Sequence, residues 1–545
     1  MGVMAHDRST MRSLRIEGMT VWTGRRLPDG RIAETDAVLV RDGRIVAMGA
    51  AARAATADQV IDATGQFLCP AFGDGHIHPI LGGLAHVFAP VGDATSVDEA
   101  VAIAKAWADE NPDAEWVRGE GLDITLAPDG VFQAAWLDSA IPDRPVYVHG
   151  SDGHTVWVNS EAMRRAGIVK GVAQPDDGEI VLDADGNPIG TLREPGAFMA
   201  VMNLLPDPTP EQATAAMESA THDLAASGIT WIQDALQTPA YLPLWIEAHR
   251  QGALHVDAEL ALWLDPKSWR EALPTYPEAR QLFDDAGIPG LRAHTVKFFA
   301  DGIIESGTGA LLSPYCDCPN SSGIPNWAPE EMAEAMIAAD ALGFTIHVHA
   351  IGDAGVRQTL DAMEKVAATN PPRDRRWTMA HLQLVDPADV PRFTELGVVA
   401  NFEPYWAHLD NWQRELNAKR LGEERLNEQY RIGTMVRSGA RVSFGSDWPV
   451  TTYKPLECLQ VAVTRQTDRA STPWMPEERI TVDEALEAYT RGIAFQAGRP
   501  DAGELRPGAR ADLVLLAEDP RAVDPMSIGE IEVLGTWKAG ERTFG

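Results

Sequence analysis

Strand-like runs alternate with helical stretches through the middle of the chain, and this alternation limits the fold more than any other feature. The helical stretches include residues 210–227 and 329–342. Such alternation is typical of an α/β fold of the (β/α)8 TIM-barrel type, whose active site gathers at the C-terminal ends of the strands. Several strand-like runs carry polar, chemically capable side chains at or near their ends: 295–299, 344–349, 377–381 and 441–447.

Both ends of the chain are rich in short strand-like runs without long helices. The runs 37–40 and 44–48 flank a turn at Asp42-Gly43, and the runs 511–516 and 531–534 precede a second turn at Ala539-Gly540. Alternating apolar runs separated by such turns indicate β-structure. We therefore expect residues 12–72 and 502–545 to form one small composite β-sandwich domain, which leaves residues 73–501 for the barrel.

A third region, residues 110–205, fits the strand–helix alternation poorly. It is rich in Asp, Gly and Pro, and residues 183–188 read as a turn within a hairpin. We expect this region to be an insertion that covers the barrel mouth.

The charge of the chain excludes some partners. Its 545 residues include 46 basic and 79 acidic side chains, giving a formal net charge of −33, which repels nucleic acid phosphates and anionic membranes. Four cysteines suit a reducing compartment, and the N-terminus lacks the apolar stretch of a signal peptide. We expect a cytoplasmic protein that acts on a small molecule, with a homodimer as one expectation for its assembly.

A His-x-His motif supplies the first candidate metal ligands. His76 and His78 follow the apolar run 67–72, and strand side chains two residues apart point to the same face. The pair could therefore hold one metal ion. Taken alone, it could equally be packed or solvated.

Further candidate ligands follow other strand-like runs. His349, His381 and Asp447 each stand at or near the end of a separate run, and a barrel would bring those ends together. Each of them alone has an ordinary alternative, since a histidine can be hydrogen-bonded in a core and Asp447 can cap the next helix. Together with His76 and His78 they provide the imidazoles and carboxylate that a hydrolytic metal site needs.

The ordered set of motifs resembles the amidohydrolase superfamily, and within it the N-substituted formamide deformylase-like branch, amidohydrolase family 3. The His-x-His alone is weakly specific, whereas the ordered set, which spans most of the chain, is strongly so. The matching segments are GDGHIH (73–78), DGHTVWVNS (152–160), VKFFADG (296–302), HAIGD (349–353), GSDWP (445–449) and GELRPGARADL (503–513).

The resemblance implies a division of the ligands. His76, His78 and Asp447 would bind one divalent metal, expected to be zinc, while His349 and His381 would bind a second ion or orient the substrate. By the same resemblance, Lys297 can be carboxylated and bridge two ions. Because a protonated ammonium has no lone pair, an unmodified Lys297 would be no ligand, and its alternative is a lysine buried against an acid.

The sequence departs from the family pattern at two positions. Ala380 precedes His381 where relatives often carry an acid, which removes one partner for a ligand imidazole. His347 is an additional histidine on the same face as His349, and we expect it to be structural.

The resemblance also implies the reaction, hydrolysis of a non-peptide C–N bond in an amide, formamide or cyclic amide. The metal would acidify a water molecule and polarise the carbonyl, and Asp447 would act as general base and then general acid. Two alternatives stay open: a metal-free scaffold or binding protein of the same fold, and a barrel enzyme that uses paired carboxylates on sugars.

Substrate contacts are harder to read from the sequence. Asp152, His154 and Trp157 lie in the expected insertion, and Trp406 and Trp448 follow strand-like runs. We expect these side chains to form an aromatic pocket for an apolar group. Core packing of the tryptophans and a loop position for Asp152 and His154 are the alternatives.

Overall fold

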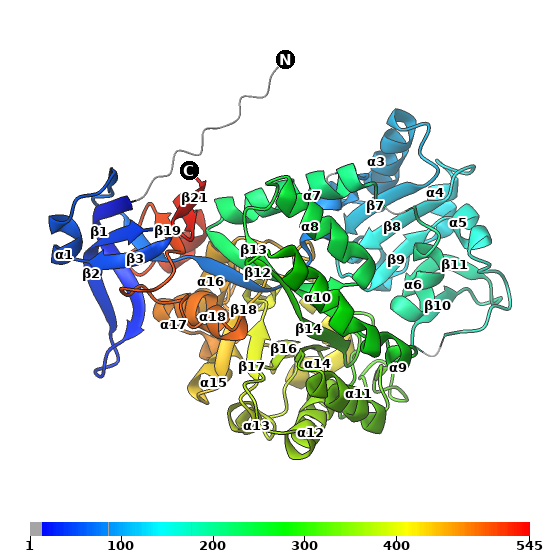
Figure 1. Cartoon of the computed structure of the whole chain (residues 1–545). Helices are drawn as coiled ribbons and strands as arrows, with labels where there is room; N and C mark the ends of the chain where they lie inside the picture. The colour runs from blue at the N-terminus through cyan, green and yellow to red at the C-terminus, as the bar shows by residue number, and fades with distance from the viewer. Residues whose placement is uncertain (1–12, 86, 176, 207) are drawn as a thin grey trace.

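The computed structural model describes residues 13–85, 87–175, 177–206 and 208–545. A central barrel carries a sheet built from both chain ends on one side and an inserted α/β unit on the other (Figure 1). In the described parts of the chain, no helix combines the length and the apolar character that crossing a bilayer requires.

Eight parallel strands form the barrel, which confirms the expected (β/α)8 fold. In sheet order they are β18 (Arg441–Phe444), β17 (Val399–Phe402), β16 (Thr378–His381), β15 (Thr345–Ala350), β14 (Leu291–Phe299), β13 (Asp257–Trp263), β12 (Ile229–Gln237) and β6 (Phe72–Ile77). The barrel closes where the segment after β18 meets β6, because the backbone N–H groups of Ser446 and Asp447 donate to the carbonyl of His76 at 3.2 and 2.8 Å. Closure therefore brings the first and last candidate ligands together.

Helices between the strands surround the barrel. They include α2 (Pro79–Ala85), α7 (Pro210–Ala226), α8 (Leu242–Arg250), α10 (Tyr276–Ala286), α11 (Pro329–Ala341), α12 (Asp353–Thr369), α13 (Val390–Leu396), α15 (Ile432–Arg437) and α16 (Pro455–Thr464). The two helices expected from sequence, α7 and α11, both begin at a proline, which suits the first helical position. Thr209 and Gln212 form a reciprocal capping box at the start of α7.

The two chain ends share one eight-stranded sheet. Its order is β21 (Glu541–Phe544), β20 (Val533–Lys538), β19 (Leu513–Leu516), β5 (Phe67–Pro70), β1 (Ser13–Arg26), β2 (Ile32–Arg41) and β3 (Arg44–Met48), with β4 (Gln59–Asp62) also paired to β1. Both expected turns have left-handed backbone, with φ of 47° and 75° at Asp42-Gly43 and 49° and 76° at Ala539-Gly540.

The apolar run 67–72 is divided between two sheets. Its first four residues are β5 of the terminal sheet, while Phe72 begins barrel strand β6. Between them, Ala71 N–H donates to Asp512 and Phe72 N–H donates to Gly228. Both partners are distant in sequence. Long-range backbone pairing therefore determines where the chain passes from one sheet to the other.

The inserted unit has its own five-stranded sheet. Its order is β10 (Glu179–Leu182), β11 (Pro188–Arg193), β9 (Thr155–Val158), β8 (Val146–Gly150) and β7 (Val117–Leu122). The turn at 183–187 joins β10 and β11 as the expected hairpin. Helix α3 (Val97–Glu110) packs in the same apolar core as β7 and β8, so this core begins upstream of residue 110.

Candidate metal centre

The strand ends bring the candidate ligands into one buried cluster at the barrel mouth. His76, His349 and His381 lie at the ends of β6, β15 and β16. His78 directly follows β6, and Asp447 lies three residues after the end of β18. The side chains of His76, His349 and His381 are at most 3 % exposed. The geometry thus assembles the set that the sequence placed at separate strand ends.

Three of these side chains converge tightly enough to share an ion. The donor atoms of His76, His381 and Asp447 all lie within 4.8 Å of one another. Asp447 Oδ1 is also 3.0 Å from His78 Nε2 and 3.5 Å from His76 Nε2. Two or three imidazoles and a carboxylate around an open position match the ligands of a catalytic zinc site.

The ring orientations are set by partners behind the donors. His347 Nε2 lies 2.9 Å from His76 Nδ1, and Glu403 Oε2 lies 3.0 Å from His381 Nδ1. The other ring nitrogen of His381, the buried Nε2, has no hydrogen-bond partner within the described chain. A buried polar atom left unpaired is costly unless it binds something, so the site fits a bound cation.

Glu403 is the functional residue that sequence reasoning missed. It directly follows the four-residue strand β17, and its side chain is fully buried. Glu403 therefore gives His381 an acidic hydrogen-bond partner, which Ala380 at the preceding position cannot provide. His347, which we expected to be structural, orients the ring of His76.

Burial shapes the charge states of the cluster. It lowers the pKa of His76 and of His347 well below the usual range, so both rings are neutral and keep a lone pair. Burial would raise the pKa of Asp447, but the hydrogen bond and charge of His78 outweigh it and hold the pKa below its usual value. The cluster therefore offers neutral imidazoles beside an ionised carboxylate.

Lys297 projects into the same cluster from β14. Its side chain is completely buried, and Nζ lies 3.5 Å from His76 Nε2. Burial lowers the pKa of Lys297 to about 7. The charges of Asp447 and Glu403 oppose this lowering. Lys297 therefore lies buried near two acids, although no described carboxylate forms an ion pair with it.

His349 stands slightly apart from the three converging donors. Its ring is 4.5 Å from that of His381, measured between centroids, but its Nε2 lies 3.2 Å from the carbonyl oxygen of Gly302. In this arrangement that nitrogen donates to the carbonyl and presents no lone pair to an ion.

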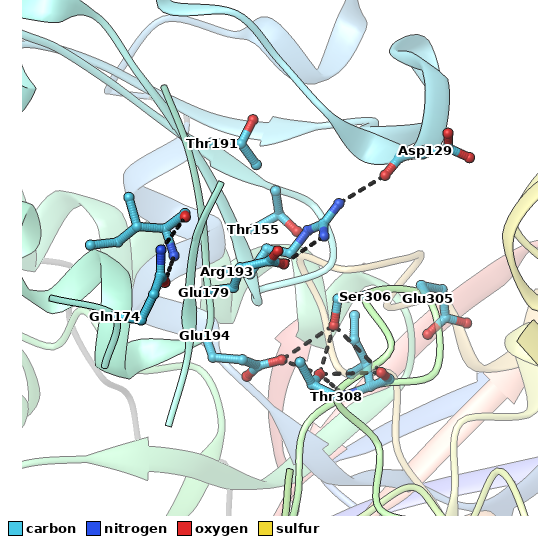
Figure 2. Close-up of polar contacts among 12 residues, drawn as sticks. Asp129, Thr155, Gln174, Glu179, Thr191, Arg193, Glu194, Glu305, Ser306 and Thr308 are labelled. Atoms are coloured by element: carbon cyan, nitrogen blue, oxygen red, sulfur yellow. Dashed lines mark hydrogen bonds and ion pairs between the residues drawn. The ribbon is translucent and has the colours of Figure 1, made fainter. Parts of the chain in front are cut away.

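His154 reaches the barrel mouth from the inserted unit. Its ring centroid is 5.2 Å from that of His349, and its Nδ1 is 2.7 Å from Glu194 Oε2. The other carboxylate oxygen of Glu194 accepts from the hydroxyls of Ser306 and Thr308 in the loop after β14 (Figure 2). Burial lowers the pKa of His154, but Glu194 outweighs it and raises the pKa to about 9.

The other expected substrate residues separate into two groups. Asp152 and Trp406 line a cavity, and the Trp406 ring stacks on His381 with 5.4 Å between centroids. Trp157 lies in the core of the inserted unit, where its indole N–H donates to Gln133, so its assignment to the pocket is corrected. The Trp448 indole packs against Gly82 of α2 and the ring of Tyr453, away from the cavity lining.

The cavity has a volume of about 600 Å³ and lies between the barrel mouth and the inserted unit. Ile303, Gln383 and Trp406 line it from loops that follow barrel strands, and Glu120 and Ser151 line it from the insertion. A volume of this size is ordinary for a small-molecule site. The inserted unit and the barrel therefore contribute to the same cavity.

Fold and site together define the class of this protein, a parallel (β/α)8 barrel with histidines and an aspartate gathered at the C-terminal ends of its strands. The chain belongs to the amidohydrolase family, whose model matches residues 59–544. It is thus a hydrolase of the amidohydrolase superfamily.

Individual relatives agree along nearly the whole chain. N-substituted formamide deformylase of Arthrobacter pascens is 27 % identical over 541 residues, covering 97 % of this chain and 98 % of the relative. Putative amidohydrolase YtcJ of Bacillus subtilis is 27 % identical over 522 residues, covering 94 % and 96 %. The crystal structure of an uncharacterized metal-dependent hydrolase from Pyrococcus horikoshii shares the fold, with a TM-score of 0.72, 22 % identity and coverage of 94 % and 99 %.

Proposed function

We propose that the protein is a metal-dependent hydrolase that cleaves a non-peptide C–N bond in a small amide, formamide or cyclic amide. The observation that carries this proposal is the unpaired, buried His381 Nε2, which faces the same point as donor atoms of His76 and Asp447. The similarity to N-substituted formamide deformylase supports a C–N bond as the target.

His76, His78, His381 and Asp447 would hold the ion, and the nitrogen and carboxylate donors suit zinc. When bound, a divalent cation there supplies the positive charge that acidifies water and polarises a substrate carbonyl. His347 and Glu403 keep the rings of His76 and His381 oriented, since each binds the nitrogen that faces away from the donor cluster.

Asp447 would move the proton during hydrolysis. Its carboxylate is ionised and sits beside both His76 and His78, so it can accept the proton of the attacking water. It then delivers that proton to the leaving nitrogen, so that water and the amide become a carboxylic acid and an amine.

Lys297 is proposed to be carboxylated when the site holds two ions. Its lowered pKa leaves much of the amine neutral near pH 7, and only a neutral amine can attack carbon dioxide. Growth with ¹³C-bicarbonate should give a carbamate NMR signal that the Lys297→Met variant lacks. A spectrum without that signal in the wild type would assign Lys297 another role.

The substrate would occupy the cavity beside Trp406, with its scissile carbonyl toward Asp447. Trp406 offers a flat apolar surface next to His381. His154 is placed to contact the substrate near His349, held there by Glu194.

The test is the Asp447→Asn variant assayed on N-butylformamide, N-butylacetamide and 2-pyrrolidinone. An asparagine oxygen can stay near the ion but is a poor base, so we expect much of the metal to be kept and turnover to fall at least about a hundredfold. Released acid and amine are measured by chromatography, and bound metal by mass spectrometry.

Near-normal turnover in the variant would remove Asp447 from the mechanism. Wild-type protein that binds metal but hydrolyses no member of the panel would contradict the C–N assignment. Protein that binds no metal and hydrolyses nothing would favour the metal-free scaffold.

A further inference from the structure

The charged side chains that line the cavity beside the metal cluster are all of one sign, negative. Among the described residues the cavity is lined by six carboxylates and by no Lys, Arg or His side chain. Asp93 is exposed to solvent. Glu120 is neutralised by Arg118 and His149, and Asp123 and Asp152 accept hydrogen bonds from donors in their own turns. Glu305 and Asp410 are the acids that need another explanation.

Glu305 is a buried carboxylate without a cation. Its side chain is 8 % exposed, and Oε1 accepts from Asn417 Nδ2 at 2.6 Å and from Gln383 Nε2 at 3.3 Å. The Glu305 backbone N–H also hydrogen-bonds to the carboxylate, and within the described chain no side chain pairs with Oε2. The nearby Arg420 donates instead to the Glu305 backbone carbonyl and to Asp317.

The side chain of Glu305 also points away from the neighbouring polar cluster. Ser306 and Thr308 turn toward Glu194, whereas the Glu305 carboxylate lies on the opposite side of the loop (Figure 2). That side is the cavity, which Glu305 lines. Oε2 is therefore available to a molecule in the cavity.

Asp410 and three aromatic rings complete this wall. Asp410 accepts from the backbone N–H of Gln413 and feels the charge of His408, but no described side chain lies close enough to form an ion pair with it. Burial raises the pKa of Glu305 and of Asp410, and Asp410 adds to the rise at Glu305. Tyr430, Trp406 and Trp412 line the same cavity, and such rings attract organic cations.

We infer that the cavity wall made by Glu305, Asp410 and Tyr430 binds an organic cation, so that the substrate carries a protonated amine on the part remote from the bond that is cut. This inference rests on the proposed function only in naming the bound molecule as the substrate. A buried carboxylate without a cationic partner is unfavourable, and an ammonium group would both neutralise it and donate to Oε2.

A second metal ion fits this wall poorly. Two amide N–H groups already point at Glu305 Oε1, and among the described residues only His76, His381 and Asp447 form a group of donors that converges on one point. An ammonium, which binds through hydrogen bonds and aromatic faces, matches the arrangement better.

The test compares two probes of equal shape, 4-phenylbutylammonium and neutral 4-phenylbutanol, titrated calorimetrically into the full-length protein at pH 7. We expect the ammonium to bind at least about tenfold more tightly than the alcohol. In Glu305→Gln, which keeps an oxygen for Asn417 and Gln383, that preference should fall at least tenfold while alcohol binding changes less than twofold.

Asp410→Asn provides a second variant, for which we expect a smaller loss of the same preference. Glu541→Gln, on the exposed hairpin of β20 and β21, removes the same charge far from the cavity and should leave both affinities unchanged. Equal binding of the two probes to wild type, or an equal loss of preference in Glu541→Gln, would overturn the inference. Displacement of the bound ammonium by Zn²⁺ at the Glu305 wall would overturn the inference in favour of a metal site.

Hydrolysis separates this inference from the proposed function. N-(4-aminobutyl)formamide should be cut with a higher kcat/KM than N-pentylformamide, and Glu305→Gln should remove the difference by raising KM. Ammonium binding without hydrolysis of either formamide would contradict the C–N assignment and support the cation site. Hydrolysis of both at equal rates would support the C–N assignment and contradict the cation site.

Discussion

At the scale of single residues, the site works through pairs in which one side chain orients another. His76 is held by His347, and His381 is held by Glu403. The ligand candidates His76, His78, His381 and Asp447 could be predicted from sequence because His-x-His and strand-end positions are local patterns. Glu403 could not, since it meets His381 only through the packing of the barrel.

Glu403→Gln should weaken the site without removing the His381 ring. A neutral amide makes a weaker partner than a carboxylate, so the imidazole becomes less basic and less fixed. We expect metal affinity to fall about tenfold to a hundredfold, measured by competition with a chelating dye. Glu541→Gln is the matched control, and an affinity unchanged in Glu403→Gln would show that Glu403 does not position His381.

For single aromatic residues, the sequence does not show whether the side chain lines a pocket or packs in a core. Trp157 lies in a segment that matches the family and Trp406 follows a strand-like run, but of the two only Trp406 lines the cavity. Trp157 packs against Phe132 and Trp136 inside the inserted unit. Burial in a core and exposure to a cavity give the same sequence signal, so only the tertiary structure separates them.

At the scale of elements, α2 connects the metal cluster to the outer layer of the barrel. It begins directly after His78 and packs on α7 through a glycine: a Cβ on Gly83 would lie 2.2 Å from the backbone oxygen of Ala216. Backbone cannot move aside as a side chain can, so this glycine fixes how closely the two helices approach.

Gly83→Ala should therefore lower thermal stability and weaken metal binding together. Alanine favours the helix by about 1 kcal/mol, but forcing two backbones apart costs about 1–3 kcal/mol and displaces the helix that follows His78. The melting temperature and metal affinity would be measured in parallel. Gly529→Ala, whose Cβ would meet nothing closer than 3.3 Å, is the control, and a Gly83→Ala protein with unchanged melting would contradict the close packing of α2.

Element boundaries were predictable where the signal is local. Helices α7 and α11 end within one residue of expectation, because a proline start and apolar spacing mark them in the sequence. Strands β12 and β13 were not identified, and the division of residues 67–72 between β5 and β6 depends on Asp512 and Gly228. Because these pairing partners are so distant in sequence, no local sequence pattern marks the boundary between the two strands.

At the scale of the whole molecule, Asp257 connects the barrel to the C-terminal segments. Standing at the start of β13, it forms ion pairs with Arg499, with Arg510 at 2.7 Å and with Lys538 at 3.4 Å. Burial would raise the pKa of Asp257, but these three cations outweigh it and hold the pKa below its usual value.

Asp257→Asn should destabilise the molecule by about 3 kcal/mol at pH 7, because it leaves three cations without their shared partner. A carboxyl whose pKa is lowered by folding contributes stability above its unfolded pKa of about 3.9 and loses it as pH falls through the folded pKa. The difference in melting temperature from wild type should therefore be large at pH 7 and narrow below about pH 4. Asp36→Asn, which removes an exposed ion pair with Arg53, should change little at either pH; an equally small effect of Asp257→Asn would contradict the linking role.

The central claim is that the barrel mouth holds a divalent metal through His76, His381 and Asp447, and the most direct measurement is the metal content of purified protein. After dialysis against micromolar zinc, we expect at least one ion per chain in the wild type and about a tenth of that or less in the double variant His76→Asn/His381→Asn. Wild-type protein without stoichiometric metal, or a double variant that keeps it, would contradict the account.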